Sequence, residues 1–292
     1  MIRVATRGSA LALAQAEEVR AALRLAHPTL GVALLEVATT GDLLLEVSLE
    51  SVEGKGFFSG SLERAVSARR ADLAAHSLKD LPVVLSPGFC IAAVLEREDP
   101  ADVIASPHGG LAQLPARAVV GTDSARRRTQ LAVVRPDLVF VPIRGNVPTR
   151  LDKLDRGEVD AVVLAAAGLR RLGLDHRISE RLEPWVCLPA PGQGAVAVEA
   201  LEDGEAGSLA AAADHAPSRA AVTAERAFLE ALGGGCSTPA GALAAVSGRR
   251  LTLLAATVEA GARVTVEVAG EAAEAAAIGA EAAARMIAGA RR

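Results

Sequence analysis

The stretch that decides the fold is AVVGTDSARRRTQLAVVRPDLVFVPIRGNVPTRLDKLDRGEVDAVVLAA, residues 118–166. Short apolar runs alternate in it with longer runs of helical character. The apolar runs are 118–122, 138–143 and 160–166, and the helical runs are 123–134 and 148–156. Strands that alternate with helices of this length form βαβ units, in which the strands run parallel. The stretch therefore predicts a parallel α/β domain.

The same alternation occurs nearer the N-terminus. Residues 2–6 and 32–38 are predicted strands, and the helix between them has Ser9 as its expected N-cap. Helix 60–69 and strand 71–77 continue the pattern. This part of the chain predicts a first α/β domain, and two such domains predict a ligand cleft between them.

The last quarter of the chain has a different pattern. A helix at 217–232 precedes two strands, at about 250–259 and 262–269, which are joined as a hairpin. An Ala-rich helix at about 271–288 follows them. A small α+β domain is predicted here, and residues 185–199 are expected to be a return crossing between the domains before it.

The composition excludes several classes of function. The 292 residues carry a net charge of −4, so no overall basic field is available to attract nucleic acid or an anionic membrane. The three cysteines show no CxxC spacing, which argues against a zinc site or a disulfide framework and for a reducing compartment. The N-terminus lacks the apolar run of a signal peptide. We therefore expect a cytoplasmic protein without a metal, nucleic-acid or membrane partner.

Arginines recur where predicted strands end, at the edge where parallel sheets bind ligands. They are Arg7, Arg126, Arg127, Arg144, Arg150 and Arg171. The guanidinium fork matches carboxylate oxygens in pairs, so these residues indicate a ligand with several carboxylates. The alternative is that they form surface salt bridges, as many arginines do.

Lys79 and Asp80 follow a predicted buried strand. A carboxylate at a strand end can stabilise a developing cation or transfer a proton. Asp is equally well suited to a turn, which the following Leu81-Pro82 favours. On residue type alone, the catalytic and the turn interpretations are equally good. His76, in the apolar strand before them, is expected to be a packed core residue.

Cys236 follows three consecutive glycines. A bulky group could approach such a loop closely, and a thiol there could form a covalent bond. The alternative is a helix C-cap followed by an incidental buried cysteine. Cys90 and Cys187 occur within apolar strand patterns and are expected in the core.

Eight segments, in order, resemble the signature segments of the porphobilinogen deaminase family. They are ATRGSALALAQ (5–15), GKGFF (54–58), ADLAAHSLKDLP (71–82), REDPADV (97–103), VGTDSARRRTQL (120–131), IRGNVPTRLDKLDRGEVDAVVLAAAGLRRLGL (143–174), LPAPGQGAVAVE (188–199) and ERAFLEALGGGCSTP (225–239). The resemblance extends over essentially the whole chain and is weakest after residue 240. Eight ordered matches are far more specific than one short motif.

The resemblance implies a transferase of tetrapyrrole (haem) biosynthesis that joins four porphobilinogen units, with loss of ammonia, into hydroxymethylbilane. It implies two periplasmic-binding-protein-like parallel α/β domains with a cleft between them, plus a small C-terminal α+β domain. Domain 1 would comprise 1–95 and 195–212, domain 2 would comprise 96–194, and domain 3 would comprise 216–292 and carry the cysteine loop. We expect a monomer.

The resemblance also implies a covalent dipyrromethane cofactor, attached by a thioether to Cys236. It assigns catalysis to Asp80 and Lys79. It assigns cofactor binding to Ser77, Lys79, Asp80, Thr122, Ser124, Arg126 and Arg127. It assigns substrate binding to Arg7, Ser9, Phe58, Arg144, Arg150, Arg171 and Gln193.

The implied chemistry suits these residue types. Porphobilinogen carries an acetate and a propionate, so each added ring brings two carboxylates for the arginines. Loss of ammonia leaves an azafulvene cation, which Asp80 could stabilise through hydrogen bonds from the pyrrole N–H groups. The Gly-rich stretch 41–58 is a candidate lid that Lys55 and Phe58 would help to close. Asp123 departs from the family, where a serine is common, and we expect it to point away or to pair with a neighbouring arginine.

Two other classes of protein share the expected architecture. A non-catalytic two-lobed binding protein would not need the glycine–cysteine loop or the Lys79-Asp80 pair. The ligand-sensing part of a regulator would need a DNA-binding segment, and neither end of the sequence shows a basic region or a helix-turn-helix. The sequence therefore favours the enzyme.

Overall fold

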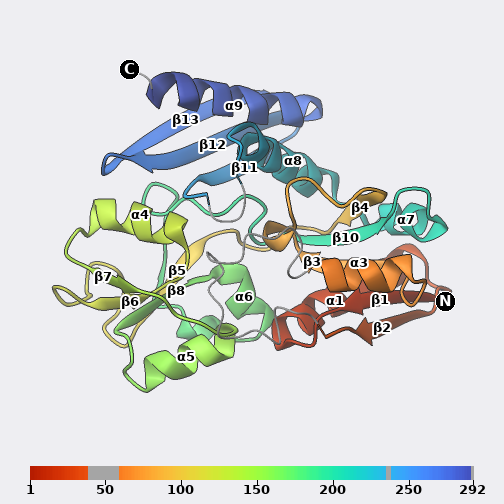
Figure 1. Cartoon of the computed structure of the whole chain (residues 1–292), viewed down its shortest axis with the longest axis horizontal. Coiled ribbons are helices and arrows are strands. Elements are labelled where there is room, and N and C mark those ends of the chain that lie inside the picture. Colours follow the sequence, from red (N-terminus) through yellow and green to blue (C-terminus); the bar gives the residue numbers. More distant parts are fainter. Residues whose placement is uncertain (39–58, 235–237, 291–292) are drawn as a thin grey trace. The chain divides into compact units, whose positions relative to one another are not determined.

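The structure, a computed structural model, describes residues 1–38, 59–234 and 238–290. The chain divides into two compact units, and each contains an α/β sheet (Figure 1). The first unit comprises Met1–Glu98 and Ala195–Arg219. The second comprises Asp99–Gly194 and Ala220–Arg292.

The first unit is built on a five-stranded sheet in the order β2-β1-β3-β10-β4. Its strands are β1 (Ile2–Thr6), β2 (Val32–Glu36), β3 (Leu73–Ser77), β4 (Phe89–Val94) and β10 (Val196–Leu201). β1 pairs in parallel with β2 and with β3, as the βαβ pattern predicts. β10 lies between β3 and β4 and runs antiparallel to both. The sheet is therefore completed by a strand that comes from much later in the chain.

Helices cover both faces of this sheet. α1 (Ala10–Ala26) begins after Ser9, whose Oγ accepts a hydrogen bond from a backbone N–H of the first turn at 3.3 Å, which confirms the predicted N-cap. α1 packs against one set of alternate strand residues, which includes Val4. α3 (Gly60–Ser67) packs against the other set, which includes Ala5. Because alternate residues of a strand face opposite sides, the two helices lie on opposite faces.

The second unit contains a five-stranded sheet in the order β7-β6-β8-β5-β9. Its strands are β5 (Asp102–Ala105), β6 (Val119–Gly121), β7 (Val139–Val141), β8 (Ala161–Ala165) and β9 (Glu180–Arg181). The helices are α4 (Ala125–Val134), α5 (Val147–Asp155) and α6 (Ala166–Arg171). β6 pairs in parallel with β7 and β8, which confirms the β-α-β-α-β prediction. β5 runs antiparallel to β8 and β9.

The C-terminal part forms a separate layer with its own apolar core. Its elements are α8 (Ala216–Ala231), β11 (Gly241–Ser247), β12 (Arg250–Glu259), β13 (Ala262–Glu271) and α9 (Ala275–Ala290). The strands form an antiparallel sheet, and α9 packs along β13 (Figure 1). A Cβ at Gly279 of α9 would collide with the backbone oxygen of Ala224, so the glycine allows α9 to approach α8 closely.

These elements confirm the predicted α/β class with a small α+β part. The last helix begins at Ala275, later than expected, because residues Ala272–Glu274 form a 3₁₀ turn. The short helix α7 (Glu205–Ala210) follows β10 in the first unit. Among the described residues, no helix is long and apolar enough to cross a membrane.

Candidate functional site

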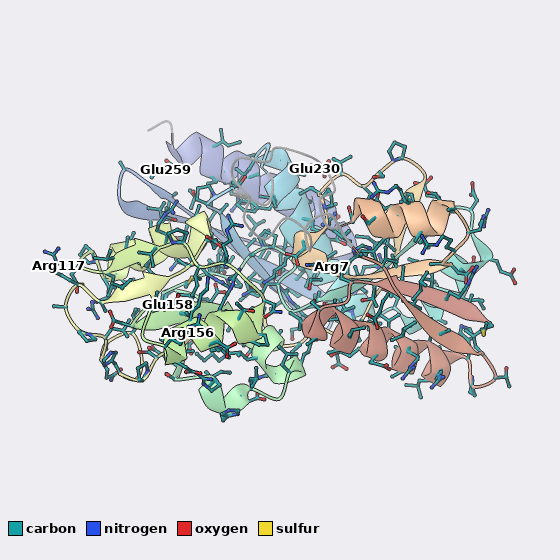
Figure 2. The ribbon with its side chains drawn as sticks, turned by 60° about the horizontal axis from the view of Figure 1, so that its bottom comes forward. Arg7, Arg117, Arg156, Glu158, Glu230 and Glu259 are labelled. Carbon is teal, nitrogen blue, oxygen red and sulfur yellow. The ribbon has the colours of Figure 1, made fainter. Side chains whose placement is uncertain are left out.

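The first unit gathers predicted site residues at one edge of its sheet. β1 and β3 are parallel neighbours, so the chain leaves both strands at the same edge. Arg7, which follows β1, lies half-buried in the loop before α1 (Figure 2). Ser77 ends β3, and its Oγ lies 2.8 Å from Nε2 of Gln15 in α1. The helix thereby fixes the position of the Ser77 hydroxyl.

Lys79 and Asp80 lie in a 3₁₀ helix, Leu78–Asp80, that follows β3 directly. The backbone N–H of Leu78 donates a hydrogen bond to the oxygen of Ala195 at 3.0 Å, which ties this turn to the start of β10. Lys79 is half-buried, whereas Asp80 is exposed. Asp80 is therefore a turn residue, as its sequence context favours, and its carboxylate is also accessible to a ligand.

Glu199 is a buried acid that the sequence pattern did not single out. It lies in β10 with 0% exposure, and its Oε2 is 2.9 Å from Nε2 of His76 in β3. His76 is confirmed as a buried residue, but a carboxylate faces it where we expected only apolar packing. Neither atom makes a hydrogen bond of good geometry with a described residue. This contact between His76 and Glu199 links β3 to β10 close to the turn that carries Asp80.

The second unit contains a buried ion cluster centred on Asp102, the first residue of β5. Nη1 of Arg126 donates to Oδ2 of Asp102 at 2.6 Å, and Nε and Nη2 of Arg127 donate to Oδ1 at 2.9 and 2.7 Å. Burial by itself would raise the pKa of Asp102, but the two arginine charges outweigh it and hold the pKa well below its usual range. Two cations face one anion here, so the cluster has an excess positive charge.

This cluster shows how the predicted anion-binding groups are held. Arg127 directs all three guanidinium nitrogens to protein oxygens, the third being the backbone oxygen of Val163 at 2.8 Å. Arg126 uses only Nη1 within the described part of the chain. Gln193 is also buried, and its Nε2 donates to Oδ1 of Asp102 at 2.9 Å. The sequence analysis did not identify Asp102 as a site residue, although the segment REDPADV (97–103) contains it.

Thr122 and Ser124 shape the start of α4. Oγ of Ser124 accepts a hydrogen bond from the backbone N–H of Arg127 at 3.4 Å and caps the helix. Oγ1 of Thr122 accepts one from the backbone N–H of Ser124 at 3.2 Å. Both hydroxyls therefore hold the loop in which the sequence analysis placed the cofactor contacts.

Three further arginines follow β7 and β8, the two strands that flank β6, or lie on the helices after them: Arg144, Arg150 and Arg171. Nε of Arg150 donates to the backbone oxygen of Gly145 at 2.9 Å, and Nη2 of Arg171 donates to that of Gly194 at 3.0 Å. These two contacts fix the guanidinium groups through backbone oxygens, which carry no formal charge.

Arg144 has an acidic neighbour. Its Nε lies 3.4 Å from Oδ2 of Asp123, which confirms the expectation that Asp123 pairs with a nearby arginine. The Asp123 side chain is 15% exposed and that of Arg144 is 34% exposed. The salt-bridge interpretation of the arginines therefore holds in part for Arg144.

Two predicted residues, Phe58 and Cys236, lie outside the described residues, as does the candidate lid 41–58 with Lys55. The described chain before Cys236 shows why glycines are needed there. Gly233 has a φ of +65°. A Cβ at Gly234 would lie only 2.6 Å from a side-chain oxygen, Oγ1 of Thr238.

The other two cysteines are poorly suited to covalent chemistry. Burial, with a further contribution from Asp102, raises the pKa of Cys187 to about 12. Burial also raises the pKa of Cys90, which is half-buried in β4. A neutral thiol is a weak nucleophile. Cys187 is confirmed in the core, although it lies in the segment before β10 and outside any strand. Within the described residues, no group of His, Cys, Asp and Glu could hold a metal ion.

Comparisons with known proteins extend over both units. A family model described as "Porphobilinogen deaminase, dipyromethane cofactor binding domain" matches residues 2–208, and one described as "Porphobilinogen deaminase, C-terminal domain" matches residues 219–288. A porphobilinogen deaminase of Roseiflexus sp. (strain RS-1) is 52% identical over 252 residues, 86% of this chain and 83% of the relative. One of Xylella fastidiosa (strain 9a5c) is 50% identical over 272 residues, 92% of this chain and 89% of the relative. Among solved structures, the periplasmic VFT2 domain of Bordetella pertussis BvgS has a TM-score of 0.41 and 15% identity, and the match covers 73% of this chain and 86% of that domain.

Proposed function

The chain belongs to the porphobilinogen deaminase family, and we propose that the edges of its two α/β sheets bind the carboxylates of a growing pyrrole chain. The enzyme is a hydroxymethylbilane synthase of tetrapyrrole biosynthesis. Its substrate is porphobilinogen, and its cofactor is dipyrromethane. Substrate and cofactor are both polycarboxylates, so their binding requires accessible cations.

The observation that carries the proposal is the set of guanidinium groups at the edge of the second sheet. Asp102 holds Nη1 of Arg126, and within the described residues Nε and Nη2 of that side chain make no hydrogen bond, although only 5% of the side chain is exposed. Oδ2 of Asp123 lies 3.4 Å from Nε of Arg144, and within the described residues the two terminal nitrogens of Arg144 make no hydrogen bond. Guanidinium groups that an acid of the protein already holds, and that keep unused N–H donors, suit carboxylate binding, because little conformational entropy is lost when a carboxylate binds them.

We assign roles residue by residue on this basis. The cofactor-binding residues are Ser77, Lys79, Asp80, Thr122, Ser124, Arg126 and Arg127, with Cys236 as the thioether anchor. The substrate-binding residues are Arg7, Ser9, Phe58, Arg144, Arg150, Arg171 and Gln193. Two features support Cys236 as the anchor: the glycines before it, and the raised pKa of both other thiols.

Asp80 is the proposed catalytic carboxylate, with Lys79 beside it. In each addition, the bond from the aminomethyl carbon to nitrogen breaks and ammonia leaves. The free α-carbon of the bound chain then attacks that carbon, and its proton is lost. Positive charge develops on the substrate pyrrole before the new bond forms. An exposed carboxylate on a rigid turn can stabilise that charge by accepting hydrogen bonds from pyrrole N–H groups.

The decisive experiment is the intact mass of the purified protein. We expect the mass of wild-type protein to include covalent dipyrromethane, and the Cys236→Ala variant to have the bare mass and no turnover. Cys187→Ala and Cys90→Ala are matched controls that should keep the adduct. An adduct of unchanged mass on Cys236→Ala would refute the anchor assignment.

The remaining parts of the proposal concern organisation. We propose three domains with the boundaries given above, which the separate apolar core of the C-terminal layer supports. We propose a cytoplasmic monomer that binds no nucleic acid, in keeping with the net charge of −4. Light scattering on a gel-filtration column tests the monomer, and a dimer mass would contradict it. The lid role of 41–58 is tested by shortening that loop, which should impair elongation more than cofactor attachment.

A further inference from the structure

Asp123 and Arg144 lie side by side because the chain leaves two parallel strands at the same edge. β6 pairs with β7 in the register Gly121↔Val141, and the backbone N–H of Thr122 continues the ladder to the oxygen of Val141 at 2.9 Å. Asp123 is the second residue after the end of β6 at Gly121, and Arg144 is the third residue after the end of β7 at Val141. The loops are therefore held by strand pairing, and the two side chains meet without long flexible connections.

The contact involves a particular edge of the guanidinium. Oδ2 of Asp123 lies 3.4 Å from Nε of Arg144. Within the described residues, neither terminal nitrogen of Arg144 has a hydrogen-bond partner or another ion-pair partner. A guanidinium binds a carboxylate in bidentate fashion through two nitrogens. An acid at Nε leaves the pair of terminal nitrogens as the edge that can bind a second carboxylate.

Asp123 also has little other stabilisation. Its Oδ2 is buried and accepts no hydrogen bond from a described residue, so the positive charge of Arg144 is what compensates for its loss of water. The positions of the two groups therefore depend on each other: the carboxylate stays beside the guanidinium, and the guanidinium stays beside the carboxylate. Such mutual dependence restricts the rotamers of a long side chain that would otherwise move freely in water.

We propose that Asp123 is a positioning residue that holds Arg144 with its terminal nitrogens directed to a substrate carboxylate, and so sets the affinity for incoming porphobilinogen. This inference rests on the proposed role of Arg144 in substrate binding. Asp123 acts through Arg144 and does not touch the reacting atoms. Its removal should therefore affect substrate binding and leave the chemical step unchanged.

The test is a double-mutant cycle on the cofactor-loaded enzyme. Asp123→Asn keeps the shape and removes the charge, and we expect KM for porphobilinogen to rise about two- to fivefold, the factor that corresponds to a partly exposed charge pair. The value of kcat should stay within about twofold, because only binding is weakened. Asp123→Glu, which restores the charge, should recover part of the loss. In an Arg144→Ala background, Asp123→Asn should cause no further rise in KM.

A matched control is the exposed pair Arg156 and Glu158 near the end of α5 in the same unit, 2.7 Å apart (Figure 2). Glu158→Gln also removes one acid from an arginine, and it should leave KM unchanged. An unchanged or lower KM for Asp123→Asn, with a clear rise for Arg144→Ala, would refute the positioning role and leave substrate binding by Arg144 intact. An equal rise in both backgrounds would also refute it. If Arg144→Ala itself leaves KM unchanged, the proposed function of Arg144 fails, and this inference fails with it.

Discussion

Replacing Asp102 by Asn tests whether the buried ion cluster stabilises the second unit. The side chain is fully buried, and its two oxygens accept hydrogen bonds from both arginines and from Gln193. Asn has nearly the same shape and keeps one acceptor oxygen. The variant therefore removes a charge and leaves Arg126 and Arg127 buried beside each other without an anion.

The expected magnitude follows from that arrangement. Removing one partner of a buried ion pair costs about 3–5 kcal/mol, because the remaining charge is left without compensation. Here two cations remain, so we expect a value at the upper end, about 5 kcal/mol. The unfolding entropy is about 2.1 cal/mol/K per residue, so for 292 residues a destabilisation of 1 kcal/mol lowers the unfolding temperature by about 1.6 °C. The unfolding temperature of Asp102→Asn should therefore fall by about 8 °C.

The assay is thermal unfolding followed by circular dichroism, together with urea unfolding to obtain the free energy. Asp155→Asn is the matched control, because Asp155 forms an exposed ion pair with Arg177 in the same unit and should change stability little. If Asp102→Asn unfolds within about 2 °C of this control, the cluster does not stabilise the fold, and the reasoning is wrong.

The remaining predictions concern other parts of the molecule. Asp80→Asn should slow single-turnover elongation by about 100- to 1000-fold, and Asp80→Glu should retain more activity, because the stabilisation is electrostatic; a near wild-type rate for Asn would leave Asp80 as a turn residue only. His76→Ala should lower the free energy of unfolding by about 1–3 kcal/mol or more, since it leaves the buried Glu199 carboxyl without the imidazole beside it; urea unfolding measures this, and a loss below about 1 kcal/mol contradicts it. Cys187 should resist iodoacetamide in the folded protein at pH 8 and react once the protein is unfolded, because burial raises its pKa; peptide mass mapping would show an early adduct if this is wrong. The pKa of Asp102 is lower in the folded than in the unfolded state. The stability that the Asp102 carboxylate contributes to the fold should therefore be complete above about pH 4 and be lost as the pH falls from there through the folded pKa. A difference in unfolding free energy between wild type and Asp102→Asn that grows on acidification would have the wrong sign and would contradict this prediction.

Local pattern predicted much of this fold. The strands and helices of 118–166 and the cap at Ser9 follow from residue type and spacing, and the structure has them nearly where expected. The pairing of β10 between β3 and β4 does not follow from local pattern, because it depends on contacts between residues far apart in sequence. Short strands such as β9 carry too few residues to show a period.

The site was predicted less completely than the fold, for a related reason. The sequence places arginines at strand ends, but it does not show which acid each one meets. Asp102 is separated from Arg126 by 24 residues along the chain, and only the fold brings them together. Glu199 lies in an apolar strand whose neighbours give no sign of its partner. An isolated acid inside an apolar strand is the signal that could have identified Glu199, since such a group requires a partner; Asp102 begins its strand close to two other acids, Glu98 and Asp99, and shows no such signal.

The position of β10 has a consequence for the order in which the chain folds as it is made. Synthesis proceeds from the N-terminus, and domains that emerge first commonly fold first. Here β4 has β10 as its neighbour in the sheet, and β10 is translated only after every strand of the second five-stranded sheet. In the nascent first unit, the edges of β3 and β4 that pair with β10 therefore stay unpaired while the second α/β sheet can already form. The first unit is thus begun first on the ribosome but is completed after the second α/β sheet. Until β10 has been made, a chaperone would have to cover the exposed strand edges of the first unit.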